Sequence, residues 1–428
     1  MSTRRDTATV GTSVRSHTGW LWVRATRKIW FRAALISAAS VIVAALAGKL
    51  ARLIPYEFTG DVGQDAVGSV LEILASSMLA VTTFSLTAMV SAYSSATQLA
   101  TPRATQLMIS DRTSQNALST FLGAFVFSVV GVIGLQTELY GGQGRVVLLI
   151  ATVLIIALVV VTLLRWIGHL AAFGRMADVI DRVEDAGCAA MRAFACDPHA
   201  GGRPAVPVPD GAQPIPPARI GYVTHVDVAA LGRLARRHGL VVHVEALPGT
   251  LVHDGRPLMR VSGGTLEEEV SKALRGAFTV ERHRSFDQDP RLGLIALAEI
   301  AARALSPAVN DPGTAVEVSN ALLRMLSLLP PDEPPADADR PPVHVPRHRA
   351  EDLVRDGFTA IVRDGASAEE VAVRAFKALA AIGRAVPHAA TTTAALIDEL
   401  RSNVEREMED AAARKRTLAI YRQAISPA

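Results

Sequence analysis

Residues 146–164 read VVLLIATVLIIALVVVTLL, a run of nineteen uncharged residues that Arg165 closes. Only the hydroxyl groups of Thr152 and Thr162 interrupt its aliphatic character. An α-helix rises 1.5 Å per residue, so about twenty apolar residues cross the hydrocarbon core of a bilayer. The stretch therefore predicts a transmembrane helix.

Three more apolar segments precede this one. We expect the first span at residues 31–54, the second from residue 66 to 102 and the third at 117–135. The second includes thirty residues without a charge, 73–102. As a helix these would be ~45 Å long, against a hydrocarbon core of ~30 Å. We therefore expect this helix to tilt, to protrude or to break at Thr101-Pro102-Arg103, because proline ends helices.

The distribution of basic residues sets the expected topology. Only Asp6 opposes the basic residues before the first apolar run, which are Arg4, Arg5, Arg15, Arg24, Arg27, Lys28 and Arg32. Such a flank favours a cytoplasmic N-terminus, and four crossings return the C-terminus to the cytoplasm. A cleaved signal peptide is the alternative for the first span, since Ala45-Leu46-Ala47 resembles a cleavage site. The long leader and the later spans favour an uncleaved anchor.

The fold class we expect is an α-helical membrane domain of about four transmembrane helices, followed by an α+β, mostly helical cytoplasmic domain. A formal net charge of +3 gives no indication of nucleic-acid binding. The expected parts, in chain order, are a basic cytoplasmic segment (1–30), the four-helix membrane domain (31–170), an exit helix with a Pro/Gly-rich linker (171–218), a small β-containing module (219–265) and a helical cytoplasmic domain (266–428).

The second span carries polar residues at helical spacing. Their separations of 3, 4, 7, 4, 4, 3 and 4 residues follow the 3.6-residue period, so they share one face of the helix. The members of this polar stripe are Ser69, Glu72, Ser76, Thr83, Thr87, Ser91, Ser94 and Gln98.

Two interpretations of the polar stripe stay open. Hydroxyl groups can solvate ions along a water-filled pathway, and an outer carboxylate can select cations. Small hydroxyl residues also let helices pack closely and bond to neighbouring backbones. Glu72 is the one carboxylate within the predicted spans, where an ionisable group is costly unless it is paired or wet. It is either a selectivity or proton-binding site or the partner of Lys49 or Arg52.

The cytoplasmic half shows signals for short elements. Asp227 is placed to cap a helix that Gly239 ends, and residues 240–246 alternate as a half-buried strand does. Asp254-Gly255 predicts a hairpin turn between two short strands. A second Pro-rich break is expected at residues 330–347 and three helices in 349–425.

A polar loop separates two helices predicted around residues 292–305 and 315–329. Asp311 can cap the second helix with Pro312 at its first position, which is a sufficient structural explanation. A ligand site is the functional alternative, and its candidate residues are Ser306, Asn310, Asp311 and Thr314.

The sequence gives no positive support for enzymatic chemistry. It contains no phosphate loop, no HExxH and no GxSxG pattern. The spacing of Cys188 and Cys196 fits neither a zinc site nor a disulfide framework, and we expect both to be reduced packing residues. Packed or solvated histidines are expected at His225, His243 and His253 rather than a metal site. We expect no catalytic residues, no cofactor and no metal.

Several motifs resemble one known family. They are Thr101-Pro102-Arg103, Asp111-Arg112, TFLGAF at 120–125, Gln288-Asp289-Pro290 and ALSPAVNDPGTA at 304–315. The chain is similar, over most of its length, to the bacterial predicted membrane proteins labelled domain of unknown function 2254. The resemblance implies a multi-pass protein of a bacterial plasma membrane, and it implies no established activity.

The functional hypothesis is a homo-oligomeric ion channel or transporter in the lipid bilayer, with a regulatory cytoplasmic domain and an unidentified ion or small ligand. The alternative is a non-conducting sensor or scaffold whose cytoplasmic domain binds a ligand or partner. A channel predicts that the polar stripe faces a solvated lumen. A scaffold predicts that the stripe packs against the other spans.

Overall fold

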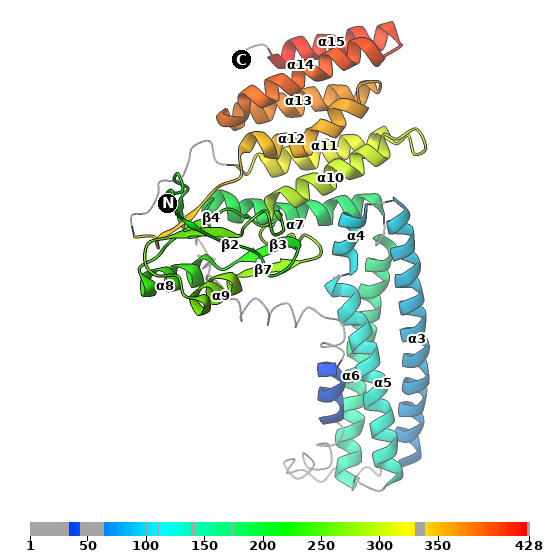
Figure 1. Cartoon of the computed structure of the whole chain (residues 1–428). Helices are drawn as coiled ribbons and strands as arrows, with labels where there is room; N and C mark the ends of the chain where they lie inside the picture. The colour runs from blue at the N-terminus through cyan, green and yellow to red at the C-terminus, as the bar shows by residue number, and fades with distance from the viewer. Residues whose placement is uncertain are drawn as a thin grey trace, which may run out of the picture. The chain divides into compact units, whose positions relative to one another are not determined.

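A computed structural model describes residues 34–42, 64–99, 101–109, 111–137, 140, 142–172, 175–329 and 339–425 (Figure 1). The chain divides into two compact units, with the boundary between Val179 and Ile180. We call the described residues before this boundary the membrane unit and those after it the C-terminal unit.

The membrane unit is built from long apolar helices. They are α3 (Gln64–Leu99), the short α4 (Pro102–Ile109), α5 (Arg112–Gln136) and α6 (Gly142–Ala172). Within the described residues, the lengths of α3, α5 and α6 and their apolar composition suit them to cross a membrane. The expected break at proline is confirmed, because α3 ends at Leu99 and α4 begins at Pro102.

The first expected span lies largely outside the described residues. Residues 34–42 are helical, as predicted. This short segment lies against α5, since a Cβ built on Gly123 would come within 2.5 Å of Ile36 Cγ2 and 3.2 Å of Ser40 Oγ. Glycine therefore permits this close approach, as small residues do between membrane helices.

Large apolar side chains fill the space between α3, α5 and α6. Leu71, Phe127 and Leu148 are completely buried in one layer, and Gly131 leaves room for Leu71 there. A second layer contains Leu74, Met78, Phe121, Val159 and Trp166. This packing fixes which side of each helix faces its neighbours.

The C-terminal unit contains two small sheets. The first has the strand order β1-β8-β4-β6-β2 and the second β5-β3-β7. The strands of the first are β1 (Arg203–Pro204), β8 (Val343–Val345), β4 (Val241–Val244), β6 (Met259–Ser262) and β2 (Gln213–Ile215), and those of the second are β5 (Leu251–Val252), β3 (Gly221–Val226) and β7 (Phe278–Glu281).

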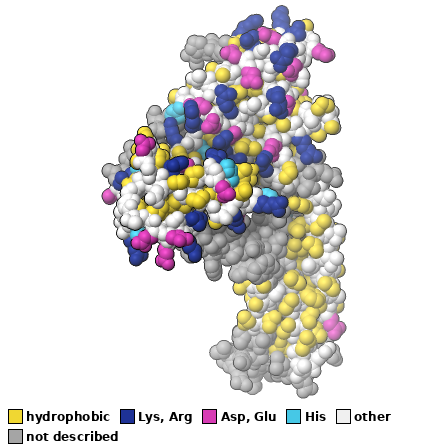
Figure 2. All heavy atoms as spheres, in the orientation of Figure 1, with side chains coloured by type: hydrophobic (Ala, Val, Ile, Leu, Met, Phe, Trp, Pro, Cys, Tyr) yellow, Lys and Arg dark blue, Asp and Glu magenta, His cyan; other side chains and the backbone are white. Residues whose placement is uncertain are grey.

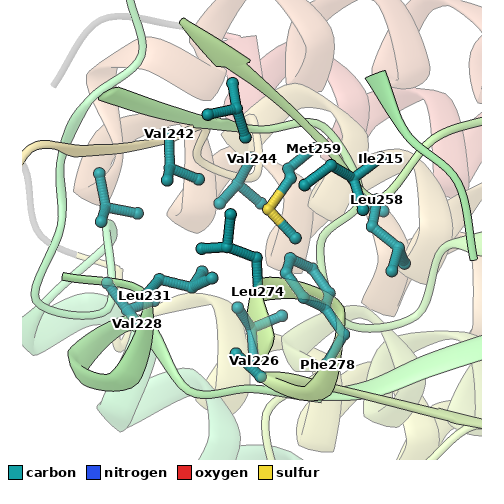
Figure 3. Close-up of a cluster of buried hydrophobic side chains, with 14 of the residues drawn as sticks. Ile215, Val226, Val228, Leu231, Val242, Val244, Leu258, Met259, Leu274 and Phe278 are labelled. Carbon is teal, nitrogen blue, oxygen red and sulfur yellow. The ribbon is translucent and has the colours of Figure 1, made fainter. Parts of the chain in front are cut away.

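The sheets and two short helices share one apolar core. The helices are α8 (Val228–His238) and α9 (Glu268–Gly276). Figure 3 shows side chains from strands, such as Val242 and Met259, directed toward Leu231 and Leu274 of the helices. The caps of α8 are confirmed: the Asp227 carboxylate accepts from Ala230 N, and Gly239 takes the left-handed conformation.

Two expectations for this region need correction. Residues 254–255 do form the expected turn, which one antiparallel bridge between His253 and Arg256 closes, but pairing goes no further, because β5 joins one sheet and β6 the other. Part of the stretch expected as a linker forms β1 and β2, and the second Pro-rich break contains β8. These strands have two or three residues, too few for an alternating pattern.

Helices form the rest of this unit. They are α7 (Met176–Cys196), which begins in the membrane unit, α10 (Pro290–Ala304), α11 (Pro312–Leu326), α12 (Ala350–Asp364), α13 (Glu369–Ala385), a 3₁₀ turn η2 (Pro387–Ala389), α14 (Ala390–Glu407) and α15 (Ala411–Ile425). The expectation of three helices after residue 349 is wrong, because four α-helices form there. Two glycines allow α7 and α10 to cross closely: a Cβ on Gly293 would lie 2.7 Å from Gly187 Cα.

Asp-Pro pairs start both α10 and α11. Asp289 accepts hydrogen bonds from the backbone amides of Arg291 and Leu292, and Asp311 accepts one from that of Thr314. The two caps differ in burial. Asp289 is 1% exposed and forms an ion pair with Arg284 at 2.7 Å, whereas Asp311 is exposed.

Candidate functional site

The polar stripe lies on the outer face of α3. Every member whose side chain the structure describes is exposed, and only the side chain of Gln98 lies outside the description. The buried residues Val67, Leu71, Leu74 and Met78 occupy the opposite side of the helix, where α5 and α6 pack. The stripe is therefore not covered by α5 or α6.

Some hydroxyl groups of the polar stripe satisfy their own hydrogen bonds. Ser76 donates to the carbonyl oxygen of Ile73 at 3.1 Å, Thr83 to that of Leu79 at 3.0 Å and Thr87 to that of Thr83 at 3.0 Å. Bonds of this kind let a hydroxyl face lipid without leaving a donor unused. The hydroxyl groups alone therefore do not distinguish a lipid-facing surface from a wet one.

Glu72 is the charged member of the polar stripe. No residue that the structure describes forms a hydrogen bond or ion pair with its carboxylate. The pairing with Lys49 or Arg52 that the sequence left open falls outside the described residues. Glu72 lies six residues, about 9 Å of helix, from the start of the apolar window at Ala66. An exposed carboxylate within an apolar span is more stable facing water than facing lipid.

Apolar side chains flank the polar stripe on both sides. Ile73 and Phe84, 65% and 69% exposed, lie along one flank, and Leu79, Leu86 and Val90 lie along the other. Figure 2 shows that hydrophobic side chains cover much of the visible surface of these helices. The exposed half of α3 is thus a polar track between two apolar borders.

A buried pair of titratable side chains, which the sequence did not indicate, joins α5 to α6. His169 Nε2 lies 2.9 Å from Asp111 Oδ2, and Asp111 is only 8% exposed. The same carboxylate caps α5 by accepting from the amide and the hydroxyl of Ser114. The His169 ring also lies 5.8 Å from that of Trp166. The pair links the start of α5 to the last turn of α6.

Further buried polar groups follow Asp111 along one edge of α5. Gln115 and Ser119 come one and two turns later, and both side chains are almost fully buried. Their oxygens, Gln115 Oε1 and Ser119 Oγ, bond to no described residue. An Asp-x-x-Ser pattern could have indicated the cap at Asp111, but His169 lies 58 residues away and no spacing rule connects the two.

The loop around Asn310 uses its polar groups locally. Asp311 accepts from the Thr314 hydroxyl at 2.6 Å and from its amide at 3.1 Å, and these bonds lower the pKa of Asp311. The Ser306 hydroxyl donates to the carbonyl oxygen of Arg303, and Asn310 adopts a left-handed φ of 50°. Asparagine tolerates that conformation well. The geometry matches a turn between two helices. Ser306, Asn310 and Asp311 lie in this turn, and Thr314 lies in the first turn of α11.

The three histidines considered as a metal site, His225, His243 and His253, lie on different elements. His225 is buried on β3 and His243 on β4, in different sheets, and His253 is exposed in the turn after β5. Among the described residues, no three His, Cys, Asp or Glu side chains form a group that could hold a metal ion.

Comparison with known proteins gives one match. The model of the family described as "Predicted membrane protein (DUF2254)" matches residues 26–381. Neither the curated proteins nor the solved structures give a match.

Proposed function

Because the chain belongs to the DUF2254 family of predicted membrane proteins, we propose that it is a homo-oligomeric channel for small cations, with α3 lining the pore. The observation that carries this proposal is the position of the polar stripe. It lies on the exposed face of α3, opposite the face that packs against α5 and α6.

The length of the polar stripe suits a pore. From Ser69 to Gln98 it spans 29 residues, about 43 Å of helix, which exceeds the ~30 Å hydrocarbon core. A second copy of the chain that places its own stripe opposite would enclose polar side chains between them. The apolar borders of α3 would then contact neighbouring copies or lipid.

Energetics favour this arrangement over a monomer in lipid. A carboxylate on a transmembrane helix costs about 2.5–3.5 kcal/mol at the bilayer centre and less toward the interface. A water-filled lumen removes that cost for Glu72 and lets its carboxylate attract cations. A ring of such carboxylates attracts cations, and hydroxyl oxygens such as that of Thr83 offer ligands along the path.

We place the protein in a bacterial plasma membrane with both termini in the cytoplasm. The basic leader and the even number of expected crossings support this orientation. The C-terminal unit would then lie in the cytoplasm and regulate opening.

The test is cation flux into liposomes that contain the purified protein. Glu72→Gln removes the charge and Thr83→Val removes a hydroxyl of the stripe. Thr82→Val is the matched control, because the Thr82 side chain is half-buried off the stripe and donates to the Met78 carbonyl oxygen at 2.6 Å. We expect the first two variants to change conductance or ion selectivity while the control retains parental flux.

An absence of flux for several cations, pH values and membrane tensions would refute the channel. It would favour the alternative of a non-conducting sensor or scaffold. Equal effects of Thr83→Val and Thr82→Val would also contradict the proposal, because they would show that the stripe has no special contact with the permeating ion.

A further inference from the structure

Four basic residues lie in cross-strand register on the first sheet. Arg203 of β1 is opposite His344 of β8, His344 is opposite His243 of β4, and His243 is opposite Arg260 of β6. Residues in register on adjacent strands share one face, with strands about 4.8 Å apart. We call these four residues the basic row.

The two histidines at the centre of the basic row are in direct contact. Their rings stack with centroids 5.2 Å apart and an interplanar angle of 11°. His243 is 4% exposed, its Nε2 lies 3.3 Å from Ser262 Oγ, and its Nδ1 bonds to no described residue. His344 Nδ1 lies 2.7 Å from the carbonyl oxygen of Pro204. Stacked neutral imidazoles are compatible with this burial, whereas two stacked imidazolium ions repel.

The charged groups around the histidines offer little compensation. Glu245 is engaged by Arg260 at 2.7 Å. Arg203 donates from Nε to the carbonyl oxygen of Arg340, and Asp197 is engaged by Arg340 at 2.9 Å. Glu245 and Asp197 thus already have cationic partners. A further histidine contacts β8 itself, since His199 Nδ1 lies 2.7 Å from the carbonyl oxygen of Val345. Protonation of His243 would place a second cation in register with Arg260.

We propose that β8 is an acid-releasable clasp, which opens when the buried, stacked imidazole of His243 takes up a proton. β8 lies between β1 and β4 in the sheet, and the chain continues from it into α12. A proton signal at the sheet therefore changes how firmly the start of the C-terminal helices is held. This device is independent of the channel proposal, because it rests on other residues and has its own measurement.

The direction of the pH dependence follows from His243. Burial and the neighbouring His344 lower the pKa of His243 below its ordinary value of 6.5. The closed sheet thus prefers the neutral ring, and its stability is lost as the pH falls below about 6.5. If the closed form excluded the proton from His243 completely over this range, the ratio of open to closed β8 would rise about tenfold from pH 7.5 to 5.5, and this is the upper limit for one histidine.

Hydrogen exchange of the full-length protein in lipid nanodiscs tests the clasp. Exchange of residues 241–244 and 343–345 is measured at pH 7.5 and 5.5 and corrected for the intrinsic rate at each pH. We expect protection to fall at pH 5.5 in the parent, by at most about tenfold. His243→Phe keeps an aromatic ring in the stack and should abolish the fall, whereas His253→Phe, at an exposed histidine, should retain it.

His344→Gln provides a second test of the clasp. It removes the half-exposed imidazole of the stacked pair and leaves the buried His243 in place. It should reduce the acid response even if His243→Phe does not fold. Unchanged protection of the parent at pH 5.5 would overturn the proposal. An undiminished acid response in His344→Gln or in folded His243→Phe would overturn it equally.

Discussion

Replacing Asp289 with alanine should destabilise the C-terminal unit several times more than the same replacement of Asp311. Both residues cap a helix and precede a proline, so the loss of the cap is common to them and costs about 1 kcal/mol. Asp289 alone is buried against an arginine. Arg284, 15% exposed, donates to its carboxylate at 2.7 Å, and Gly249 lies so close that a Cβ there would meet Asp289 Oδ2 at 2.4 Å.

Removing the Asp289 carboxylate leaves the Arg284 guanidinium largely buried without its partner. Breaking a buried pair from one side costs about 3–5 kcal/mol, because the remaining charge is uncompensated. The intact ion pair itself stabilises the fold by less than this amount, since burial raises the pKa of Asp289 in spite of Arg284. For a unit of this size, 1 kcal/mol corresponds to about 2–4 °C in Tm. With the cap included, Asp289→Ala should cost about 4–6 kcal/mol, and we therefore expect a loss of about 8–24 °C for this variant and about 2–4 °C for Asp311→Ala.

Thermal unfolding of the full-length protein in detergent, followed by circular dichroism, measures both changes. The double variant Asp289→Ala/Arg284→Leu should recover part of the loss, because it removes the unpaired charge as well. Equal Tm shifts for Asp289→Ala and Asp311→Ala would refute the reasoning, since they would show that burial of the ion pair adds nothing to the cap.

Three further outcomes are expected. Gly293→Ala should lower stability by about 1–3 kcal/mol in the same thermal assay, because the added Cβ meets the backbone of Gly187. Gly187→Ala should cost less, because the nearest atom to its added Cβ is the flexible end of a methionine side chain. Asp111→Asn should weaken the bond to His169 and speed hydrogen exchange in the last turn of α6; unchanged exchange would contradict a role in joining the helices. The lowered pKa of Asp311 stabilises the fold above about pH 4 and this contribution is lost on acidification, so urea unfolding of Asp311→Asn should depend less on pH between 5 and 3.

Local signals in the sequence predicted much of the fold. Uncharged runs identified α5 and α6, and the proline after Thr101 predicted the end of α3. The caps of α8 and α11 were also predicted, because a cap depends on a few neighbouring residues. Pairing between distant strands was not: Arg203 lies beside His344, and two-residue strands carry no period that could reveal such a partner.

Of the candidate site, only the arrangement of residues along a single helix could be predicted from the sequence. The spacing from Ser69 to Gln98 showed that the polar residues share a face, but not which face α5 and α6 would leave exposed. Asp111 and His169 lie on different helices, so their contact depends on how α5 packs against α6. The same holds for the basic row, where strand register alone brings the four residues into line.

The lengths of the membrane helices should make their inclination in the bilayer depend on the lipid composition. Their apolar windows contain 29, 24 and 27 residues, or about 44, 36 and 41 Å of helix, all longer than the ~30 Å hydrocarbon core. Mismatch costs a fraction of a kcal/mol per Å, and thicker bilayers reduce it. Longer acyl chains should therefore favour upright helices and shorter ones inclined helices, so that bilayer thickness itself shifts the balance between conformations of the membrane unit.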